Sequence, residues 1–273
     1  MIKQVFYLSD STGITVETLG HTLLTQFGDV EFNKIHRPYL QDVYAVKKVI
    51  TEINQSASEQ QSPPIVFSTL VCSESRALLK QSKALLFDLF DMFIEPIEAK
   101  LNLKSTREVG RSHGMGMYED YKTRIDAVHF AITNDDGVST QYYDKANIIM
   151  VGVSRCGKTP TCLYLAINYG IHAANYPLTI EDLESEHIPD ALKPYRQKLY
   201  GLNIHPTRLS QIRKERRPNS RYAELSQCQF EVRSAVALFQ KENLDFLDTS
   251  SMSIEEISAH ILDDTGLQRR INE

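Results

Sequence analysis

The chain has 273 residues, of which 42% are hydrophobic and 24% charged, and its formal net charge is −5 at pH 7. This composition fits a globular protein with one large core or two smaller ones, and the negative charge argues against a general nucleic-acid binder. No apolar run approaches membrane-spanning length, and the first residues turn polar too soon for a signal peptide. Four cysteines without metal-ligand spacing predict a cytoplasmic protein with no structural metal site.

Strand-like and helix-like segments alternate along the first half of the chain, which predicts an α/β architecture. An apolar strand at 5–8 leads into a loop at 9–13 and then into a helix whose apolar residues recur from 16 to 27. The other elements predicted in this half are a helix at 43–53, a polar loop at 55–64, a strand at 65–70, a helix at 74–87 and a short strand at 92–94.

The middle of the chain contains the predicted domain boundary. The pattern breaks from 102 to 117, where 113–117 is typical of a flexible segment, and helical character returns at 118–132 before the turn Asp135-Asp136-Gly137. We place the boundary near residue 145, which gives an N-terminal α/β domain at 1–145 and a second domain at 146–273.

The second half is also predicted to be α/β, with a mostly parallel sheet. Its predicted strands lie at 147–151, 173–176, 201–204 and 245–247. Its predicted helices lie just after residue 159 and at 207–217, 221–241 and 253–262. Ser253 and Glu256 form a capping-box pattern at the start of the last helix.

The most informative motif follows the predicted strand at 147–151. It fits the P-loop pattern without a mismatch and reads Gly152, Val153, Ser154, Arg155, Cys156, Gly157, Lys158 and Thr159. In such a glycine loop the backbone N–H groups turn inward around a phosphate chain, and the following helix N-terminus adds partial positive charge. We expect Lys158 to reach the phosphates and the Thr159 hydroxyl to bind Mg²⁺. The domain at 146–273 is therefore predicted to be a kinase-like P-loop nucleotide-binding domain.

Two further segments have more than one interpretation. The loop Ser9-Asp10-Ser11-Thr12-Gly13 is either a second anion site or a local helix cap. A positive segment reaches from Arg208 to Arg221 and contains Arg216 and Arg217. It is either a basic lid that stabilises charge during phosphoryl transfer or a solvated helix face.

Acidic candidates are more numerous than the roles that they would fill. A carboxylate that holds Mg²⁺ through water could be Asp248, Asp135 or Asp136. A general base for a hydroxyl acceptor could be Asp10, Asp135, Asp136 or His113. The sequence does not choose among them.

Four motifs occur together in an order that resembles a known family, the bacterial pyruvate, phosphate/water dikinase regulatory proteins. They are the loop that begins at Ser9, the Asp135-Asp136-Gly137 turn, the glycine loop with Pro160, and Arg216-Arg217-Pro218-Asn219-Ser220-Arg221-Tyr222-Ala223. The resemblance covers essentially the whole chain, and the set of motifs is far more specific than the glycine loop alone.

The resemblance implies a bifunctional enzyme with unusual chemistry. As an ADP-dependent serine/threonine kinase, such a protein inactivates its target, here expected to be phosphoenolpyruvate synthase, by phosphorylating a threonine. As a phosphorylase, it reverses this with inorganic phosphate and releases pyrophosphate. The resemblance implies a nucleotide site at 152–159, Mg²⁺ as cofactor, and Lys158, Arg216, Arg217 and Asp10 as catalytic residues. A homodimer is left open.

Other functions remain open on the residues alone. The target could instead be pyruvate, phosphate dikinase. The chain could also be an ATP-dependent small-molecule kinase with an arginine lid, or a nucleotide-sensing regulator without catalysis.

Overall fold

The computed structural model describes residues 2–106, 117–137, 140–185 and 187–271. The chain divides into two compact units, Met1–Gly114 and Met115–Glu273. The division falls earlier than the boundary predicted near residue 145. The reason is that α5 (Met117–Thr133) packs on the second unit, where Ala127 and Ala131 enter its core.

The first unit is built on a four-stranded parallel sheet in the order β2-β1-β3-β4. Its strands are β1 (Ile2–Leu8), β2 (Glu31–Arg37), β3 (Ile65–Ser68) and β4 (Leu85–Asp88). Its helices are α1 (Ile14–Leu24), α2 (Val43–Gln60), α3 (Ser73–Leu79) and α4 (Leu89–Leu101).

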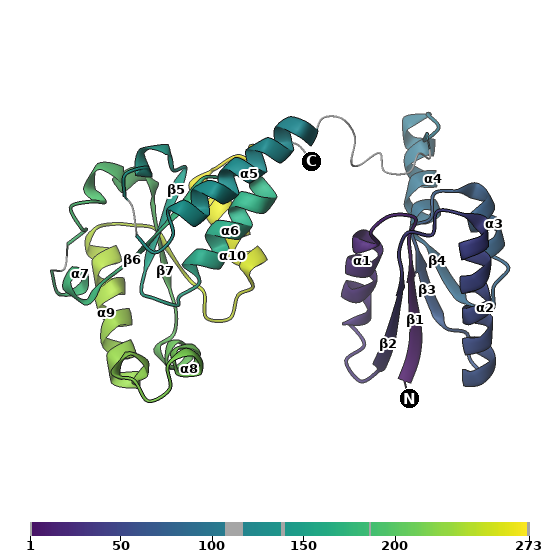
Figure 1. The fold of residues 1–273 in the computed structure, drawn as a ribbon, viewed down its shortest axis with the longest axis horizontal. Helices are drawn as coiled ribbons and strands as arrows, with labels where there is room; N and C mark the ends of the chain where they lie inside the picture. Colours follow the sequence, from purple (N-terminus) through teal and green to yellow (C-terminus); the bar gives the residue numbers. More distant parts are fainter. Residues whose placement is uncertain (1, 107–116, 138–139, 186, 272–273) are drawn as a thin grey trace. The chain divides into compact units, whose positions relative to one another are not determined.

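Side chains of β1 alternate between two apolar cores, as the period of a strand requires. Val5 and Tyr7 pack with α1 on one face, and Phe6 and Leu8 pack with α2 on the other. Figure 1 shows α1 on one side of the sheet and α2 and α3 on the other side. The unit therefore has three layers, with the sheet in the middle.

The second unit repeats this plan with strand order β6-β5-β7-β8, again all parallel. Its strands are β5 (Ile148–Gly152), β6 (Ala173–Pro177), β7 (Leu199–Asn203) and β8 (Phe246–Asp248). Its remaining α-helices are α6 (Lys158–Tyr169), α7 (Ile180–Ser185), α8 (Pro206–Arg216), α9 (Leu225–Lys241) and α10 (Ile254–Thr265). Short 3₁₀ helices are η2 (Tyr143–Lys145), η3 (Lys193–Lys198) and η4 (Arg221–Ala223).

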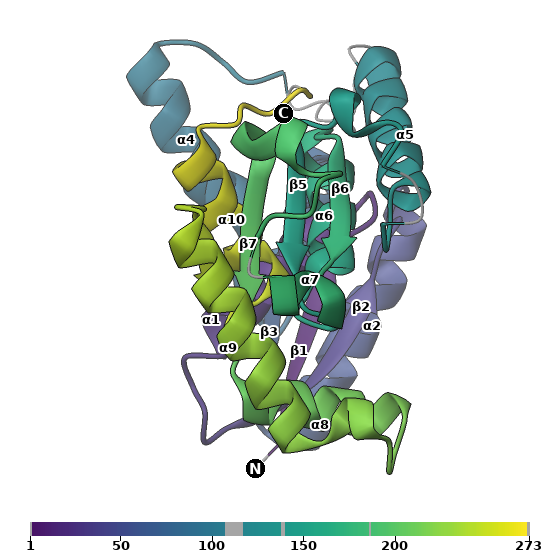
Figure 2. The same cartoon turned by 90° about the vertical axis from the view of Figure 1, so that its left-hand side faces the viewer.

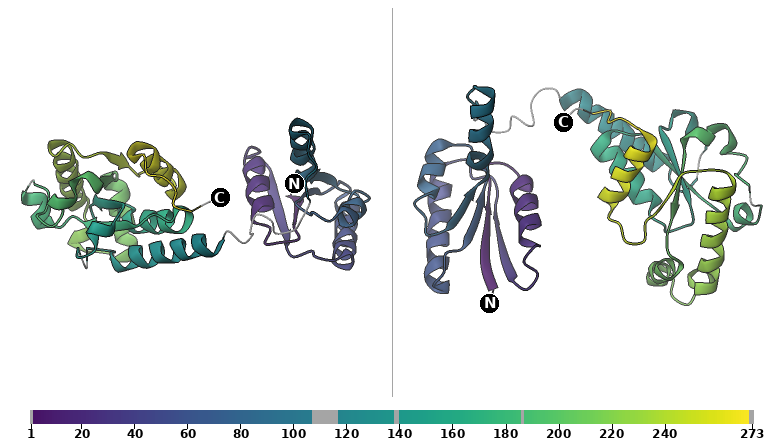
Figure 3. Two further views of the ribbon diagram at one scale, coloured as in Figure 1. Left: turned by 90° about the horizontal axis from the view of Figure 1, so that it is seen from above. Right: turned by 180° about the vertical axis from the view of Figure 1, so that it is seen from behind.

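Helices cover both faces of the second sheet. Helices α5 and α10 pack with α6 on one face, and α9 packs with α7, α8 and β7 on the other. Figure 2 shows α9 and α7 in front of the strands, and Figure 3 shows the same layers from further angles. The predicted fold class, two α/β halves with mostly parallel strands, is confirmed.

Several predicted elements of the first half are wrong. The polar loop at 55–64 is largely helix, because the buried face of α2 continues through Ile53 and Ser56. The helix at 74–87 ends at Leu79, and β4 takes the apolar run that begins at Leu85. The strand at 92–94 lies inside α4, whose first turn is capped by the carboxylate of Asp88.

Other differences are smaller. Strand β2 was not predicted, because it is an edge strand whose side chains are exposed or half-buried and lack an apolar pattern. The helix at 221–241 is η4 followed by α9, with extended backbone at Glu224 between them. The capping box of Ser253 and Glu256 is present as predicted. The flexible segment predicted at 113–117 lies outside the described residues, apart from Met117 at the start of α5.

Among the described residues, no helix is both long and apolar enough to cross a bilayer.

A buried ion-pair cluster ties α3 to the start of α4. The buried guanidinium of Arg76 donates to Asp88 at 2.8 Å and contacts Asp91, which also pairs with Lys80 at 3.0 Å. Burial alone would raise the pKa of Asp91, but the hydrogen bonds from Arg76 and Lys80 outweigh it and lower this pKa to about 2. The ionised form of Asp91 therefore stabilises the fold.

We expect Asp91→Asn to lower the free energy of unfolding by about 1–2 kcal/mol at pH 7. Because the folded pKa lies below its ordinary value of 3.8, this contribution is complete above pH 4 and is lost as the pH falls toward 2. Urea unfolding of both proteins across this range should show the difference shrinking. The exposed Asp29 offers a control, since Asp29→Asn should change little at any pH.

Candidate functional site

The glycine loop connects the end of β5 to the start of α6. All five residues of β5 are buried, and the loop leaves the sheet at Gly152. A Cβ atom on Gly152 would lie 2.3 Å from the carbonyl oxygen of Leu202 in β7, so glycine is required for this close approach. Gly157 has φ +103°, a left-handed conformation at the N-cap of α6. The strand–loop–helix arrangement predicted for this segment is present.

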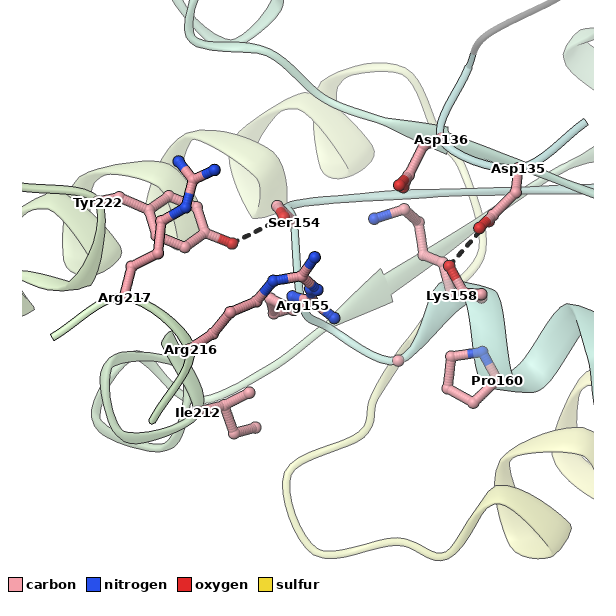
Figure 4. Close-up of a pocket in the computed structure, with 12 residues that line it drawn as sticks. Asp135, Asp136, Ser154, Arg155, Lys158, Pro160, Ile212, Arg216, Arg217 and Tyr222 are labelled. Atoms are coloured by element: carbon pink, nitrogen blue, oxygen red, sulfur yellow. Dashed lines mark hydrogen bonds between the residues drawn. The ribbon is translucent and has the colours of Figure 1, made fainter. Parts of the chain in front are cut away.

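A cavity of about 720 Å³ opens beside this loop. Its walls come from four parts of the second unit: the turn after α5, the glycine loop, the start of α6, and the region from α8 to η4. The lining residues are Asp135, Asp136, Ser154, Arg155, Gly157, Lys158, Thr159, Pro160, Ile212, Arg216, Arg217 and Tyr222. Figure 4 shows the two aspartates on one side of Lys158 and Arg216, Arg217 and Tyr222 on the other side.

Positive side chains outnumber negative ones in the lining of the cavity by four to two. Lys158 is buried, and its ammonium group donates to the carbonyl oxygen of Val153 at 2.9 Å. Arg216 and Arg217 are exposed. Among the residues that the structure describes, no carboxylate forms an ion pair with any of these three cations. Three cations beside a loop of N–H groups form an environment that favours an anion.

Two carboxylates face these cations from the turn after α5. Asp135 Oδ1 accepts a hydrogen bond from Thr159 Oγ1 at 2.8 Å and another from the amide of Asn175. Asn175 also donates to Thr159 at 3.0 Å and makes a long contact of 3.5 Å with Asp136. Asp135 is therefore held firmly, whereas the contact of Asp136 within this network is weak.

Backbone bonds fix the position of this turn. The N–H of Asn175 donates to Asn134 at 3.1 Å, and the N–H of Gly137 donates to Asn175 at the same distance. Asp136 and Gly137 both have positive φ, at 52° and 65°. The turn is thus bonded to Asn175 in the middle of β6, the strand that pairs with β5.

The group that Thr159 and Asp135 form fits a hard cation. It offers hydroxyl and carboxylate oxygens, which are the ligands that Mg²⁺ takes while phosphate oxygens complete its shell. The side-chain oxygen of the buried Asn175 has no partner within the described chain, so one more oxygen acceptor remains free beside them. In the described ranges no group of three or more Asp, Glu, His or Cys side chains could hold a metal ion. A cation at this place would therefore need phosphate oxygens as further ligands.

The structure brings together most of the predicted site residues. Ser154, Arg155, Gly157, Lys158 and Thr159 line the cavity, as do Arg216 and Arg217 from the predicted basic segment. The other three loop residues, Gly152, Val153 and Cys156, are buried and do not line it. Burial raises the pKa of the Cys156 thiol, so this cysteine stays protonated behind the loop.

Other predicted residues lie elsewhere. Asp10 belongs to the first unit, where its buried carboxylate accepts a hydrogen bond from the Val71 N–H at 2.8 Å. Asp248 accepts from the Ser250 N–H at 2.9 Å and does not line the cavity. His113 lies outside the described residues. The cap alternative for the loop at 9–13 is wrong, because the N-cap of α1 is Gly13 and no side chain caps that helix.

The sequence did not reveal three neighbours of the cavity. Ile212 and Tyr222 line it, and the hydroxyl group of Tyr222 forms a hydrogen bond of 2.8 Å with the hydroxyl group of Ser154. Asn175 holds the aspartate turn. The only sequence signal of Asn175 was a polar amide in the middle of a short strand that begins with two alanines, and nothing marked Ile212.

The glycine loop, four cationic side chains and two carboxylates lie around one cavity, an arrangement that suits phosphate groups. The model of the kinase/pyrophosphorylase family matches residues 5–262. The chain therefore belongs to the kinase/pyrophosphorylase family, a family of phosphotransferases.

Full-length relatives support this assignment. A protein of Legionella pneumophila strain Lens is 52% identical over 271 residues, which is 99% of this chain and 100% of the relative. One from Ectopseudomonas mendocina is 49% identical over the same shares, and one from Pseudomonas aeruginosa strain LESB58 is 50% identical over 99% of this chain and 98% of the relative. All three carry the provisional name phosphoenolpyruvate synthase regulatory protein.

We expect Gly152→Ala to destabilise the second unit by about 1–3 kcal/mol, because the new methyl group would overlap the backbone of β7. Gly28→Ala is the matched control, since a Cβ atom at Gly28 would meet nothing within 4 Å. Thermal unfolding of the two variants should separate them. A Gly152 variant as stable as the control would show that β5 does not need glycine at its end.

Proposed function

We propose that this protein is a bifunctional serine/threonine kinase and phosphorylase that regulates phosphoenolpyruvate synthase. The observation that carries the proposal is one cavity in which Lys158 and the glycine loop lie between a pair of carboxylates and a pair of arginines. The names of the full-length relatives support phosphoenolpyruvate synthase as the protein substrate, and the family supports phosphoryl transfer in both directions.

In the kinase direction ADP is the donor. The hydroxyl oxygen of the target threonine attacks the β-phosphorus, the bond from this phosphorus to the bridging oxygen breaks, and AMP leaves. We assign the general base to Asp136. It lines the cavity, and its contact with Asn175 is long, so its carboxylate is available to accept a proton, whereas Asp135 is hydrogen-bonded to Thr159 and Asn175. Asp10 stays an untested candidate of the first unit.

The cations act on the charge of the transferred group. Lys158 and the loop N–H groups are placed to hold the donor phosphates, and Arg216 and Arg217 to meet charge on the equatorial oxygens. Thr159 and Asp135 would hold Mg²⁺, which would neutralise further phosphate charge when bound.

In the phosphorylase direction, inorganic phosphate is the nucleophile. Its oxygen attacks the phosphorus of the phosphothreonine, pyrophosphate forms, and the threonine oxygen regains a proton, which Asp136 is placed to return. Two anions must come together for this step. Lys158, Arg216 and Arg217, which form no ion pair with a carboxylate of the described chain, lower the electrostatic cost of bringing them together.

Transfer of label tests the nucleotide choice. Purified protein and phosphoenolpyruvate synthase should give labelled phosphothreonine from ADP labelled in its β-phosphate, but not from ATP labelled in its γ-phosphate. Lys158→Ala should slow this transfer about 10²–10³-fold through lost charge stabilisation, while leaving thermal unfolding nearly unchanged. Transfer from ATP alone would favour the small-molecule or protein kinase alternatives, and nucleotide binding without transfer would favour a sensor.

The arginine pair has a distinct kinetic signature. Arg216→Ala or Arg217→Ala should lower kcat by more than it weakens ADP binding, because a side chain at the edge of the cavity meets charge mainly as it develops. Lys214→Ala is the control: it removes an exposed cation from α8 that does not line the cavity. Equal losses in kcat and in ADP affinity would show uniform phosphate binding and contradict this role.

A further inference from the structure

A buried arginine lies behind the glycine loop. Arg213 of α8 is fully buried and does not line the cavity. Its guanidinium donates to the carbonyl oxygen of Ser154 from Nη2 at 3.0 Å and from Nε at 3.3 Å. Arg213 thus holds the backbone of the loop by two hydrogen bonds without lining the cavity itself.

The same side chain reaches two other elements. Arg213 Nη2 pairs with Glu231 Oε2 of α9 at 2.6 Å, and Nη1 donates to the carbonyl oxygen of Tyr222 at 3.0 Å. The guanidinium also lies 4.1 Å from the centre of the Tyr222 ring, whose hydroxyl bonds to the Ser154 side chain at 2.8 Å. Burial alone would lower the pKa of Arg213, but the hydrogen bond to Glu231 outweighs it and raises this pKa, so the group stays charged.

The hydrogen bonds from Arg213 to the Ser154 carbonyl also fix the direction of the next N–H group, that of Arg155. In a trans peptide the C=O of one residue and the N–H of the next point in opposite directions, and no cis peptide occurs among the described residues. With the Ser154 carbonyl directed at Arg213, the Arg155 N–H must point away from Arg213. Within the described chain no group accepts a hydrogen bond from this N–H.

The loop needs such support. Arg155 has φ 77°, a left-handed conformation that costs a residue with a side chain about 1 kcal/mol or more. Without a partner on the Ser154 carbonyl, the peptide between Ser154 and Arg155 could rotate and remove one N–H from the cradle. The bonds from Arg213 oppose this rotation.

We propose that Arg213 is a positioning residue, which fixes the peptide between Ser154 and Arg155 so that the Arg155 N–H donates to a bound phosphate group. The inference rests on the proposed function of the glycine loop as a phosphate site. It also explains why α8 places the exposed Arg216 beside the loop: the buried arginine one turn earlier anchors the helix there.

The test uses the full chain with pyrophosphate and ADP as probes. Arg213→Met combined with Glu231→Leu removes both charges of the buried pair. Replacing a buried ion pair by apolar residues of similar volume often leaves the stability of a protein unchanged. We expect this double variant to fold but to bind both probes about ten- to a hundredfold more weakly in titration calorimetry, as loss of a charge-assisted hydrogen bond predicts. The Arg155 amide resonance should shift on adding pyrophosphate to the wild type and stay unchanged in the variant.

Glu231→Gln supplies the matched control. It removes the charge that pairs with Arg213 but leaves an amide oxygen to accept, so stability should fall while Arg213 keeps the Ser154 carbonyl and probe affinity is retained. If the double variant binds both probes with wild-type affinity and its Arg155 resonance still shifts, the inference is wrong while the proposed function still stands. A loss of affinity in Glu231→Gln as large as in the double variant would show that Arg213 acts only through stability, and it would also overturn the inference. No binding of either probe to the wild type would overturn the proposed function together with it.

Discussion

Parallel pairing is the constraint on which the site depends. All four strands of the second sheet run in one direction, so their carboxyl ends meet at one edge. There the end of β5 becomes the glycine loop, and Asn175, in the middle of the neighbouring strand β6, holds the aspartate turn. This edge, where the strand order reverses between β5 and its neighbours, is where parallel α/β sheets bind ligands. The close approach of Gly152 to β7 shows how tightly the loop is joined to this edge.

The cations around the glycine loop are of two kinds: one is buried behind the loop, and the others line the cavity in front of it. Behind it, the charge of Arg213 is paired with Glu231 and removed from solvent, where an unpaired charge would be costly. In front, Lys158, Arg216 and Arg217 face the cavity without a carboxylate partner among the described residues. The paired arginine shapes the loop, and the unpaired cations remain available to substrate charge. Helix α8 carries both the buried Arg213 and the exposed Arg216, so one helix contacts the loop backbone and also contributes charge to the cavity.

Local sequence predicted the elements whose signals are local. The glycine loop, its buried strand, the capping box at Ser253 and the basic character of α8 all follow from a few adjacent residues, and the structure contains each of them. Edge strand β2 could not be predicted, because its exposed side chains carry no apolar alternation. The short turn between α3 and β4 was missed, because the apolar residues on either side of it can also be read as one continuous helix.

The site depended more on contacts distant in sequence. Sequence could name Asp135, Asp136 and Asp248 as acids, but only the fold shows which of them lie beside Thr159. Asp135 accepts a hydrogen bond directly from Thr159, and Asn175, 40 residues after Asp135, contacts Asp135, Asp136 and Thr159. Likewise, nothing in the sequence distinguishes Arg213 from the other cations of the positive segment from Arg208 to Arg221. Its burial against Ser154, 59 residues away in sequence, is a property of how α8 packs.

The most direct test of the account is the fate of the phosphoryl group in the reverse direction. Phosphoenolpyruvate synthase phosphorylated on threonine should be incubated with this protein, with and without inorganic phosphate, while pyrophosphate and enzyme activity are measured together. The account predicts reactivation only when phosphate is present, with one pyrophosphate formed for each threonine restored. Reactivation at full rate in phosphate-free buffer, without pyrophosphate, would show that water is the nucleophile and would contradict it.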